Sequence, residues 1–315
     1  MGETRSMILA WLRAPIAALC LLVAACAAPN APGIDCDLTR ITQMQLRQNQ
    51  GLLTVGVGIN GQWVTMLVDT GAERSLITEE TAARLRLPRD PRFVTRAGGV
   101  GGVTQSNDAR IDSFIMGDVA FPIQRLAVNR LGPGIPFDGL LGADILLAFD
   151  LDIDVPGSTL TLYRVRRCAV ANPPWTEPAV PIAGVTAQRD RMMVPFHVDG
   201  TQGVALLDTG AQSSALGVSW ARRLGLTEQT MAGDPPLMIR GVGPGTLQAR
   251  IHLFREVRIG PVVTPNARLP VLPIDIGFGG ALIGQDFLRG RRVWLSFPTR
   301  RLFISQHGHE MLARP

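Results

Sequence analysis

The sequence predicts an all-β protein built from two copies of one unit. Its 315 residues include 34 glycines and 23 prolines, and long amphipathic stretches are few. Glycine and proline punctuate the turns between short strands, so this composition favours β-structure. The third observation is an internal repeat: LVDTGAERSLI at residues 67–77 returns as LLDTGAQSSAL at residues 206–216. A repeat of this kind indicates that one structural unit occurs twice.

The repeat extends far beyond this stretch. At an offset of 139 residues, the dipeptide NG at residues 60–61 aligns with DG at residues 199–200. Both dipeptides favour the two-residue turn of a β-hairpin, and an apolar run leads from each of them into the aspartate of the repeat. Further along the chain the offset becomes 142, where LLG at residues 140–142 aligns with LIG at residues 282–284.

The repeat also sets the domain boundaries. The predicted parts are a lobe at residues 51–164, a linker at 165–190, a second lobe at 191–305 and a tail at 306–315. The linker is rich in proline and alanine, a composition that marks domain boundaries. Each lobe is expected to carry one short helix or two. The first, at residues 79–85, has Thr78 as its expected N-cap and acidic residues in its first turn.

The first fifty residues are typical of an export signal followed by a tether. An apolar run at residues 14–25, preceded by two arginines, is too short to span a membrane and predicts a secretory signal peptide at residues 1–25. The sequence VAAC that ends at Cys26 resembles the lipobox of bacterial lipoproteins, which implies cleavage before Cys26 and a lipid on its thiol. Residues 26–50 would then be the tether. The alternative is an ordinary signal peptide with a chance cysteine.

The lipobox resemblance also predicts a location. It implies a lipid-anchored protein of the bacterial cell envelope that faces the periplasm. The two alanines after Cys26 carry no retention charge, which by analogy favours the outer membrane over the inner one. Because an exported protein meets an oxidising compartment, Cys36 and Cys168 are a candidate disulfide, with two unpaired thiols as the alternative.

The charged residues exclude several classes of function. All 31 basic residues are arginine, which rules out a lysine nucleophile and P-loop chemistry. The net charge of +5 is spread over scattered arginines, with no basic run interleaved with aromatic residues, so no nucleic-acid partner is expected. The stretch HGHE at residues 307–310 is expected to be solvated rather than a metal site, and the sequence predicts neither a metal nor a cofactor.

Each copy carries the same series of motifs: an apolar strand into Asp-Thr-Gly-Ala, a glycine-rich loop, and two apolar residues followed by Gly-x-Asp-φ-Leu, where φ is apolar. This series resembles the retropepsin-like aspartic proteases over nearly all of residues 51–305. The resemblance implies two β-barrel lobes related by a pseudo-twofold axis, and an aspartic endopeptidase that hydrolyses peptide bonds of polypeptide substrates. Viral members of this family are homodimers of one such unit, whereas this chain looks like a fused form for which a monomer is sufficient.

The resemblance assigns catalysis to Asp69 and Asp208, one from each lobe. In this family a water molecule is activated between two carboxyl groups, one ionised as general base and the other protonated. Like charges about 3 Å apart cannot both ionise, so the pair shares a proton. Which aspartate holds that proton is not readable from the sequence.

Six neighbours are expected to support the active turns: Thr70, Gly71, Ala72, Thr209, Gly210 and Ala211. The resemblance implies that the threonines lock the turns together and that the glycines let the backbone pass close to the carboxylates, with their amides donating to the aspartates. Pepsin-like enzymes often carry a hydroxyl at the alanine positions, and losing that donor raises the pKa of a carboxyl group. We therefore expect a working pH from mildly acidic to near neutral.

Two glycine loops, at residues 96–105 and 240–248, are expected to be mobile flaps over the substrate. Their paired glycines are Gly99, Gly101, Gly241 and Gly243. Pro244 stiffens the second loop, so the two flaps are expected to close asymmetrically.

Two other functions fit parts of the sequence. The first is a catalytically silent lipoprotein that uses the same cleft to bind peptides. The second is a structural β-rich lipoprotein, but this function would not explain the paired flap glycines. The aspartate kept in both copies favours the enzyme. Asp144 and Asp286 form a second matched acidic pair, which is expected to cap short helices rather than to take part in catalysis.

Overall fold

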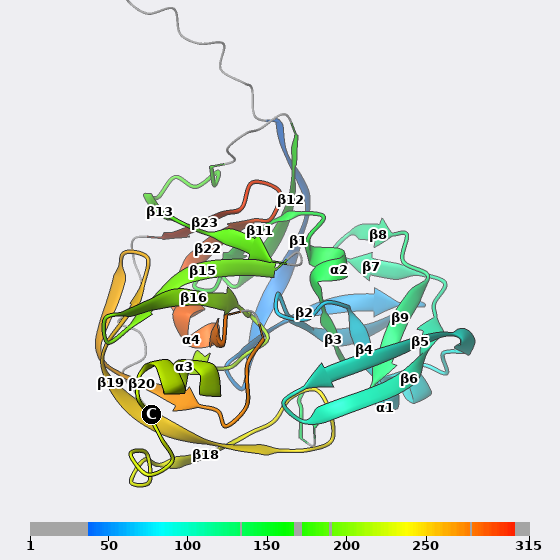
Figure 1. Ribbon diagram of the computed structural model, residues 1–315. Coiled ribbons are helices and arrows are strands. Elements are labelled where there is room, and N and C mark those ends of the chain that lie inside the picture. The colour runs from blue at the N-terminus through cyan, green and yellow to red at the C-terminus, as the bar shows by residue number, and fades with distance from the viewer. Residues whose placement is uncertain (1–36, 133, 167–171, 189–190, 278, 306–315) are drawn as a thin grey trace, which may run out of the picture. The chain divides into compact units, whose positions relative to one another are not determined.

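The computed structural model describes residues 37–132, 134–166, 172–188, 191–277 and 279–305 (Figure 1). These residues form two mostly β lobes, which confirms the predicted all-β fold class. Both lobes belong to one compact unit of the chain. No helix in these ranges is long and apolar enough to cross a membrane.

The elements of the N-terminal half are β1 (Asp37–Asn49), β2 (Leu52–Ile59), β3 (Gln62–Val68), β4 (Leu76–Thr78), α1 (Glu79–Arg84), β5 (Arg89–Gly99), β6 (Gly102–Arg110), β7 (Phe114–Met116), β8 (Val119–Phe121), β9 (Arg125–Asn129), β10 (Gly139–Leu141), α2 (Ala143–Leu146), β11 (Asp150–Asp154) and β12 (Thr159–Arg166). The helix α1 follows its predicted N-cap, because the hydroxyl of Thr78 accepts a hydrogen bond from the N–H of Thr81 at 3.0 Å.

The elements of the C-terminal half are β13 (Ala179–Ile182), β14 (Thr186–Gln188), β15 (Arg191–Val198), β16 (Thr201–Leu207), β17 (Ala215–Leu216), α3 (Val218–Arg223), β18 (Pro236–Ile239), β19 (Leu247–Ile259), β20 (Val262–Val271), β21 (Ala281–Ile283), α4 (Gln285–Leu288), β22 (Arg292–Ser296) and β23 (Arg301–Ser305).

Both predicted hairpin turns are present. Asn60 and Gly61, between β2 and β3, have φ angles of 48° and 77°. Asp199 and Gly200, between β15 and β16, have φ angles of 48° and 84°. Positive φ at both positions is the requirement of a type I′ turn, so the two short dipeptides determine where these hairpins form.

A parallel strand holds the end of each hairpin in the middle of its lobe. β3 runs parallel to β10, with Leu67 beside Leu140, and β10 is antiparallel to β4. In the second lobe β16 runs parallel to β21, with Leu206 beside Leu282, and β21 is antiparallel to β17. The residue that follows each central strand, an aspartate in both lobes, is therefore held by strands on either side.

Strands from both halves share one sheet, in the order β13-β23-β22-β11-β12-β1 (Figure 1). At its centre β11 pairs antiparallel with β22, and the fully buried Leu151 lies opposite the fully buried Leu295. Arg292 of β22 also reaches Asp152 of β11, with 2.7 Å between Nη2 and Oδ2. Apolar burial and this ion pair join the two lobes through the shared sheet.

Two predicted connecting segments are wrong in part. Residues 37–49 of the expected tether (26–50) form β1, which pairs with β12 and then with β2. The expected linker (165–190) contains β13 and β14, which pair with β23 and β15 and cover two sheet edges. A strand signal was present in β1, because Thr42, Met44 and Leu46 are buried in alternation.

Several predictions lie outside the described residues. These are the signal peptide at residues 1–25, the lipid on Cys26, the disulfide between Cys36 and Cys168, and the tail at residues 306–315. They stay predictions from the sequence.

Candidate active site

Asp69 and Asp208 lie at matching places where the two lobes meet. Asp69 follows β3, and its backbone N–H donates to the carbonyl oxygen of Leu141 at 3.0 Å. Asp208 follows β16 and donates in the same way to Ile283 at 2.9 Å. Their two carboxyl groups lie within hydrogen-bond reach of each other, and Asp69 is only 9% exposed. The structure therefore brings the two predicted aspartates into one pair.

Each carboxyl group rests on the glycine of the opposite turn. A Cβ atom added to Gly71 would lie 2.5 Å from Cγ of Asp208, and one added to Gly210 would collide with Cγ of Asp69 in the same way. Only glycine fits at such a distance. The N–H groups of Gly71 and Gly210 donate to Oδ1 of the aspartate in their own turn, at 3.0 and 2.9 Å, as predicted.

Replacing either glycine by alanine is expected to displace the facing carboxyl group. The methyl group has no space, so the turn must move at a cost of about 1–3 kcal/mol in the free energy of unfolding. Thermal unfolding of Gly71→Ala and Gly210→Ala measures this cost. Gly233→Ala is the matched control, because a Cβ there meets nothing within 4 Å. Equal unfolding temperatures for all three variants would contradict the expected collision.

Thr70 and Thr209 interlock the two turns by reciprocal hydrogen bonds. The N–H of Thr70 donates to Oγ1 of Thr209 at 3.0 Å, and the N–H of Thr209 donates to Oγ1 of Thr70 at 3.1 Å. Each hydroxyl donates onward across the boundary, from Thr70 to the carbonyl of Leu207 at 2.7 Å and from Thr209 to that of Val68 at 2.6 Å. Both threonines are fully buried, so these bonds are shielded from water.

Burial raises the pKa of both aspartates. Desolvation, followed by the charge of Asp208, raises the pKa of Asp69 to about 8, against the N–H donors of its own turn. Burial also raises the pKa of Asp208, while the N–H donors of its turn, the hydrogen bond with Asp69 and the charge of Arg191 hold it down. Burial and the short distance between the two carboxyl groups therefore favour one proton shared by the pair over two ionised carboxylates.

The two glycine loops meet at their tips. The first is a regular hairpin of β5 and β6, paired as far as Gly99 opposite Gly102. Beyond it, the N–H of Gly101 donates to the carbonyl of Val242 at 2.9 Å, and the N–H of Gly245 donates to the carbonyl of Gly101 at 2.9 Å. The predicted flap glycines of both lobes are thus brought together.

The second loop differs from the first. Residues 240–246 lie between β18 and β19 and form no paired hairpin tip. They are tied to the other lobe instead: Gly132 donates to the carbonyl of Gly241 at 3.1 Å, and Gly243 donates to that of Arg130 at 3.3 Å. This attachment gives the two loops different surroundings, in line with the asymmetry expected from Pro244.

Apolar side chains gather beside each active turn. In the N-terminal lobe Leu52, Ala72, Leu131 and Phe137 pack, partly buried, on Leu67, Leu76, Ala127 and Leu140. In the C-terminal lobe Val100, Ile239, Leu247, Ile276 and Leu282 pack, partly buried, on Ala215, Ala249 and Leu272. Val100 belongs to the tip of the first flap, so this flap contacts the apolar cluster of the opposite lobe.

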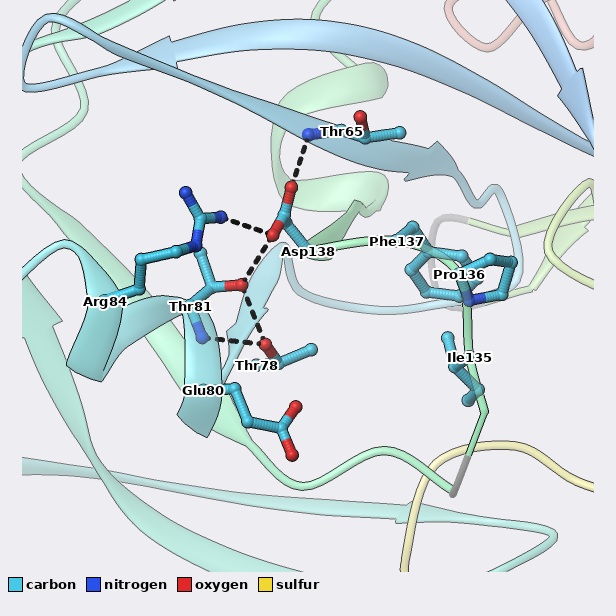
Figure 2. A pocket seen from close by; sticks show the side chains of 9 residues that line it. All are labelled: Thr65, Thr78, Glu80, Thr81, Arg84, Ile135, Pro136, Phe137 and Asp138. Atoms are coloured by element: carbon cyan, nitrogen blue, oxygen red, sulfur yellow. Dashed lines mark hydrogen bonds and ion pairs between the residues drawn. The ribbon is translucent and has the colours of Figure 1, made fainter.

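A hollow of about 350 Å³ lies beside α1, and neither Asp69 nor Asp208 is among the residues that line it (Figure 2). Asp138 accepts hydrogen bonds there from the N–H of Thr65 at 2.8 Å and the hydroxyl of Thr81 at 2.9 Å, and it pairs with Arg84. Both carboxylate oxygens are thereby occupied. These contacts hold the segment at residues 135–138, which places Phe137 in the apolar cluster of the N-terminal lobe.

Known protein families agree with this geometry. A family model described as "Aspartyl protease" matches residues 55–145, and one described as "gag-polyprotein putative aspartyl protease" matches residues 194–290. The chain belongs to the retropepsin-like aspartyl proteases. It is also 30% identical over 114 residues to the UBA domain-containing protein Mud1 of Schizosaccharomyces pombe, a stretch that covers 36% of this chain and 33% of that protein. The matched stretch thus spans a third of this relative's length.

The second acidic pair of the retropepsin-like lobes supports the active turns. The expected capping role holds only in part: α2 and α4 begin at glycines without a side-chain cap bond, although Asp286 accepts a hydrogen bond from the N–H of Phe287 in the first turn of α4 at 2.9 Å. Asp144 accepts from the N–H and the hydroxyl of Ser75 at 2.8 and 2.7 Å. Asp286 accepts from those of Ser214 at 2.9 and 2.7 Å. Each serine of the active turns thus offers two donors, its N–H and its hydroxyl, to one carboxyl group.

Arg191 contacts the active turn of the first retropepsin-like lobe, although no motif singled it out. Its Nε donates to the carbonyl of Gly71 at 2.9 Å, and its Nη1 donates to Oε1 of Glu73 at 2.9 Å. A signal was available in the repeat, because the residue 139 positions earlier is Leu52. In the alignment of the two copies, a charged residue thus takes the place of an apolar one, at the start of two strands that otherwise match.

Proposed function

We propose that the chain is an aspartic endopeptidase that hydrolyses peptide bonds of polypeptide substrates. One observation supports this most directly: Asp69 and Asp208, one from each lobe, form a shielded pair whose carboxyl groups lie within hydrogen-bond reach of each other. A carboxyl group beside a carboxylate can activate a water molecule and polarise a carbonyl at the same time. The family match of both lobes supports the same chemistry.

In the proposed reaction Asp208 takes a proton from a water molecule, whose oxygen attacks the scissile carbonyl carbon. Asp69 gives its proton to the carbonyl oxygen, so a neutral tetrahedral diol forms without a covalent enzyme intermediate. The C–N bond then breaks, and the leaving nitrogen takes the proton from Asp208. Asp69 regains a proton from a hydroxyl of the diol, which restores the resting pair. The chemistry requires no cofactor.

The apolar clusters beside the two turns support a preference for apolar side chains around the cut bond. Both clusters are partly exposed, and each begins next to an active turn. Burying apolar surface of the substrate there would contribute binding energy. The paired flap tips would close over an extended peptide and exclude water from the reacting groups.

The test is cleavage of a diverse peptide pool by the purified full-length chain, followed by mass spectrometry. A statine-type peptide, which carries a hydroxyl in place of the scissile carbonyl, serves as the inhibitor. We expect new cuts that the inhibitor abolishes. Peptides that bind without being cut at any pH would favour the silent peptide-binding lipoprotein. Cuts that persist with the inhibitor would count against the aspartic endopeptidase.

Cleavage is expected from mildly acidic pH up to about 8. Asp69 must carry its proton to act as the acid, and its pKa is raised to about 8, so activity falls as pH rises through that value. At low pH Asp208 gains a proton and no longer acts as the base; an ordinary aspartate does so near 3.9. A profile of kcat/KM from pH 3 to 9 is expected to be bell-shaped. An optimum below about pH 3.5 would contradict the raised pKa values.

We further propose that a lipid on Cys26 holds the enzyme at the periplasmic side of the bacterial cell envelope, with the outer membrane favoured. The apolar run at residues 14–25 and the lipobox-like VAAC support this. A monomer is sufficient, because one chain supplies both aspartates. The scattered arginines support no nucleic-acid partner.

A further inference from the structure

Arg191 carries a buried positive charge beside the active turn of the other lobe. Its side chain is only 7% exposed. It starts β15 in the second lobe and donates from Nε to the carbonyl of Gly71 at 2.9 Å. Gly71 is the residue that packs against the carboxyl group of Asp208. The guanidinium is therefore bonded to a residue that supports Asp208.

The pseudo-twofold partner of this arrangement is neutral. The repeat aligns Arg191 with Leu52 and Glu73 with Gln212. Leu52 packs in the apolar cluster of the N-terminal lobe. Gln212 donates from Nε2 to the carbonyl of Gln50, at the start of the same segment. One side of the aspartate pair thus carries an ion pair, and the other side carries an apolar residue and an amide.

The ion pair leaves a positive field at Asp208. The side chain of Glu73 is 66% exposed, so water screens its charge, whereas the buried charge of Arg191 is screened little. A nearby positive charge favours the ionised form of a carboxyl group, and Arg191 lowers the pKa of Asp208. The bond from Arg191 to the carbonyl of Gly71 also polarises the N–H of the same peptide group, which points at Asp69. The effect of this polarisation on Asp69 is weaker than the effect of a full unit charge on Asp208.

We propose that Arg191 is a positioning residue that keeps Asp208 ionised and the shared proton on Asp69. The role of Arg191 in catalysis rests on the proposed function, in which Asp208 is the general base and Asp69 is the general acid. Among the described residues, the active turns and the helices that follow β10 and β21 also carry the charged groups Glu73, Arg74, Asp144, Asp286 and Arg289. Of these, Arg74 is paired with Asp108, and Arg289 acts on Asp286.

Carbon-13 NMR of the aspartate Cγ atoms, in the full-length chain between pH 3 and 9, tests the proposal without relying on cleavage. Asp69→Asn and Asp208→Asn assign the two signals. Arg191→Gln keeps a donor for Gly71 but removes the charge, so the titration midpoint of Asp208 is expected to rise by about one pH unit. The acid limb of the kcat profile is expected to shift equally, with KM little changed.

Three further variants sharpen the test. Glu73→Gln removes a charge that water already screens and is expected to leave the Asp208 midpoint almost unchanged, and Arg191→Lys is expected to keep it near the wild-type value. Arg258→Gln, which breaks the half-exposed pair with Glu256, is the matched control and is expected to change nothing.

An Asp208 midpoint that stays unchanged in Arg191→Gln overturns the proposal. If Arg191→Gln does not fold, Arg191→Leu, which copies the matching Leu52 of the other lobe, decides, and an unchanged midpoint there overturns it equally. Shifted midpoints in a protein that cleaves no peptide would support the position of the proton and count against the proposed function. The two failures are therefore distinguishable.

Discussion

Asp69→Asn and Asp208→Asn are each expected to lower kcat/KM at least about a thousand-fold. Asparagine keeps the shape of the side chain but can neither take a proton from water nor share one across the pair. The remaining carboxyl group loses its partner, so either substitution removes the activation of water as a whole. The structure supports equal losses, because the two residues occupy matching positions in the two turns.

Initial rates on the best peptide of the pool measure this loss. Asp112→Asn is the control, because Asp112 is exposed and lies outside the site. Circular dichroism of each variant checks that the fold is kept. If either variant retained more than about a tenth of the wild-type kcat/KM, the assignment of catalysis to this pair would be wrong.

Asp69→Asn is also expected to change how the stability of the folded protein depends on pH. The pKa of Asp69 is raised to about 8, whereas an unfolded chain releases this proton near 3.9. Between these values the native protein binds a proton that the unfolded chain has lost, so wild-type stability falls as pH rises through the window. Asp69→Asn has no such proton, and its unfolding temperature should gain on the wild type from about pH 4 to 8. A constant difference would contradict the raised pKa.

Thr70→Val and Thr209→Val are each expected to lower the free energy of unfolding by about 2–5 kcal/mol. Each removes one hydroxyl that donates to a carbonyl and accepts from an N–H of the other lobe. Valine keeps the shape but leaves both partners buried and unsatisfied, at about 1–3 kcal/mol each. Thermal unfolding should show a fall of roughly 5–15 °C for each variant.

The network also predicts how the two substitutions combine. The two hydroxyls belong to one network between the same two turns, so the costs of Thr70→Val and Thr209→Val are expected to be non-additive in the double variant. Thr70→Ser and Thr209→Ser keep the hydroxyl and are the matched controls, expected to lose little. Strict additivity, or serine variants as unstable as the valine variants, would show that the hydroxyl bonds do not hold the lobes together.

Several features were readable because they depend on neighbours in the chain. The NG and DG dipeptides predicted the hairpins, since positive φ is a local demand on two residues. The helix after Thr78 was readable for the same reason, from its cap. The repeat then allowed Asp69 and Asp208 to be named as a pair before their distance was known.

Other features were not readable because they depend on partners far away in the chain. β1 alternates like a strand, but its partner β12 follows more than a hundred residues later. β13 contains Pro181 and looks like part of a linker, yet an edge strand tolerates proline. The acidic pair Asp144 and Asp286 was matched correctly between the copies, but its serine partners come from another part of each lobe.

The sequence by itself determined the all-β class, the two lobes, their hairpin turns and the matched turns of Asp69 and Asp208. These follow from local backbone preferences and from the repeat. Only the tertiary structure decided how strands of both halves share one sheet, and which charged groups lie near each aspartate. Proton position depends on burial and on charges acting through space, and Arg191 reaches Gly71 from 120 residues away along the chain.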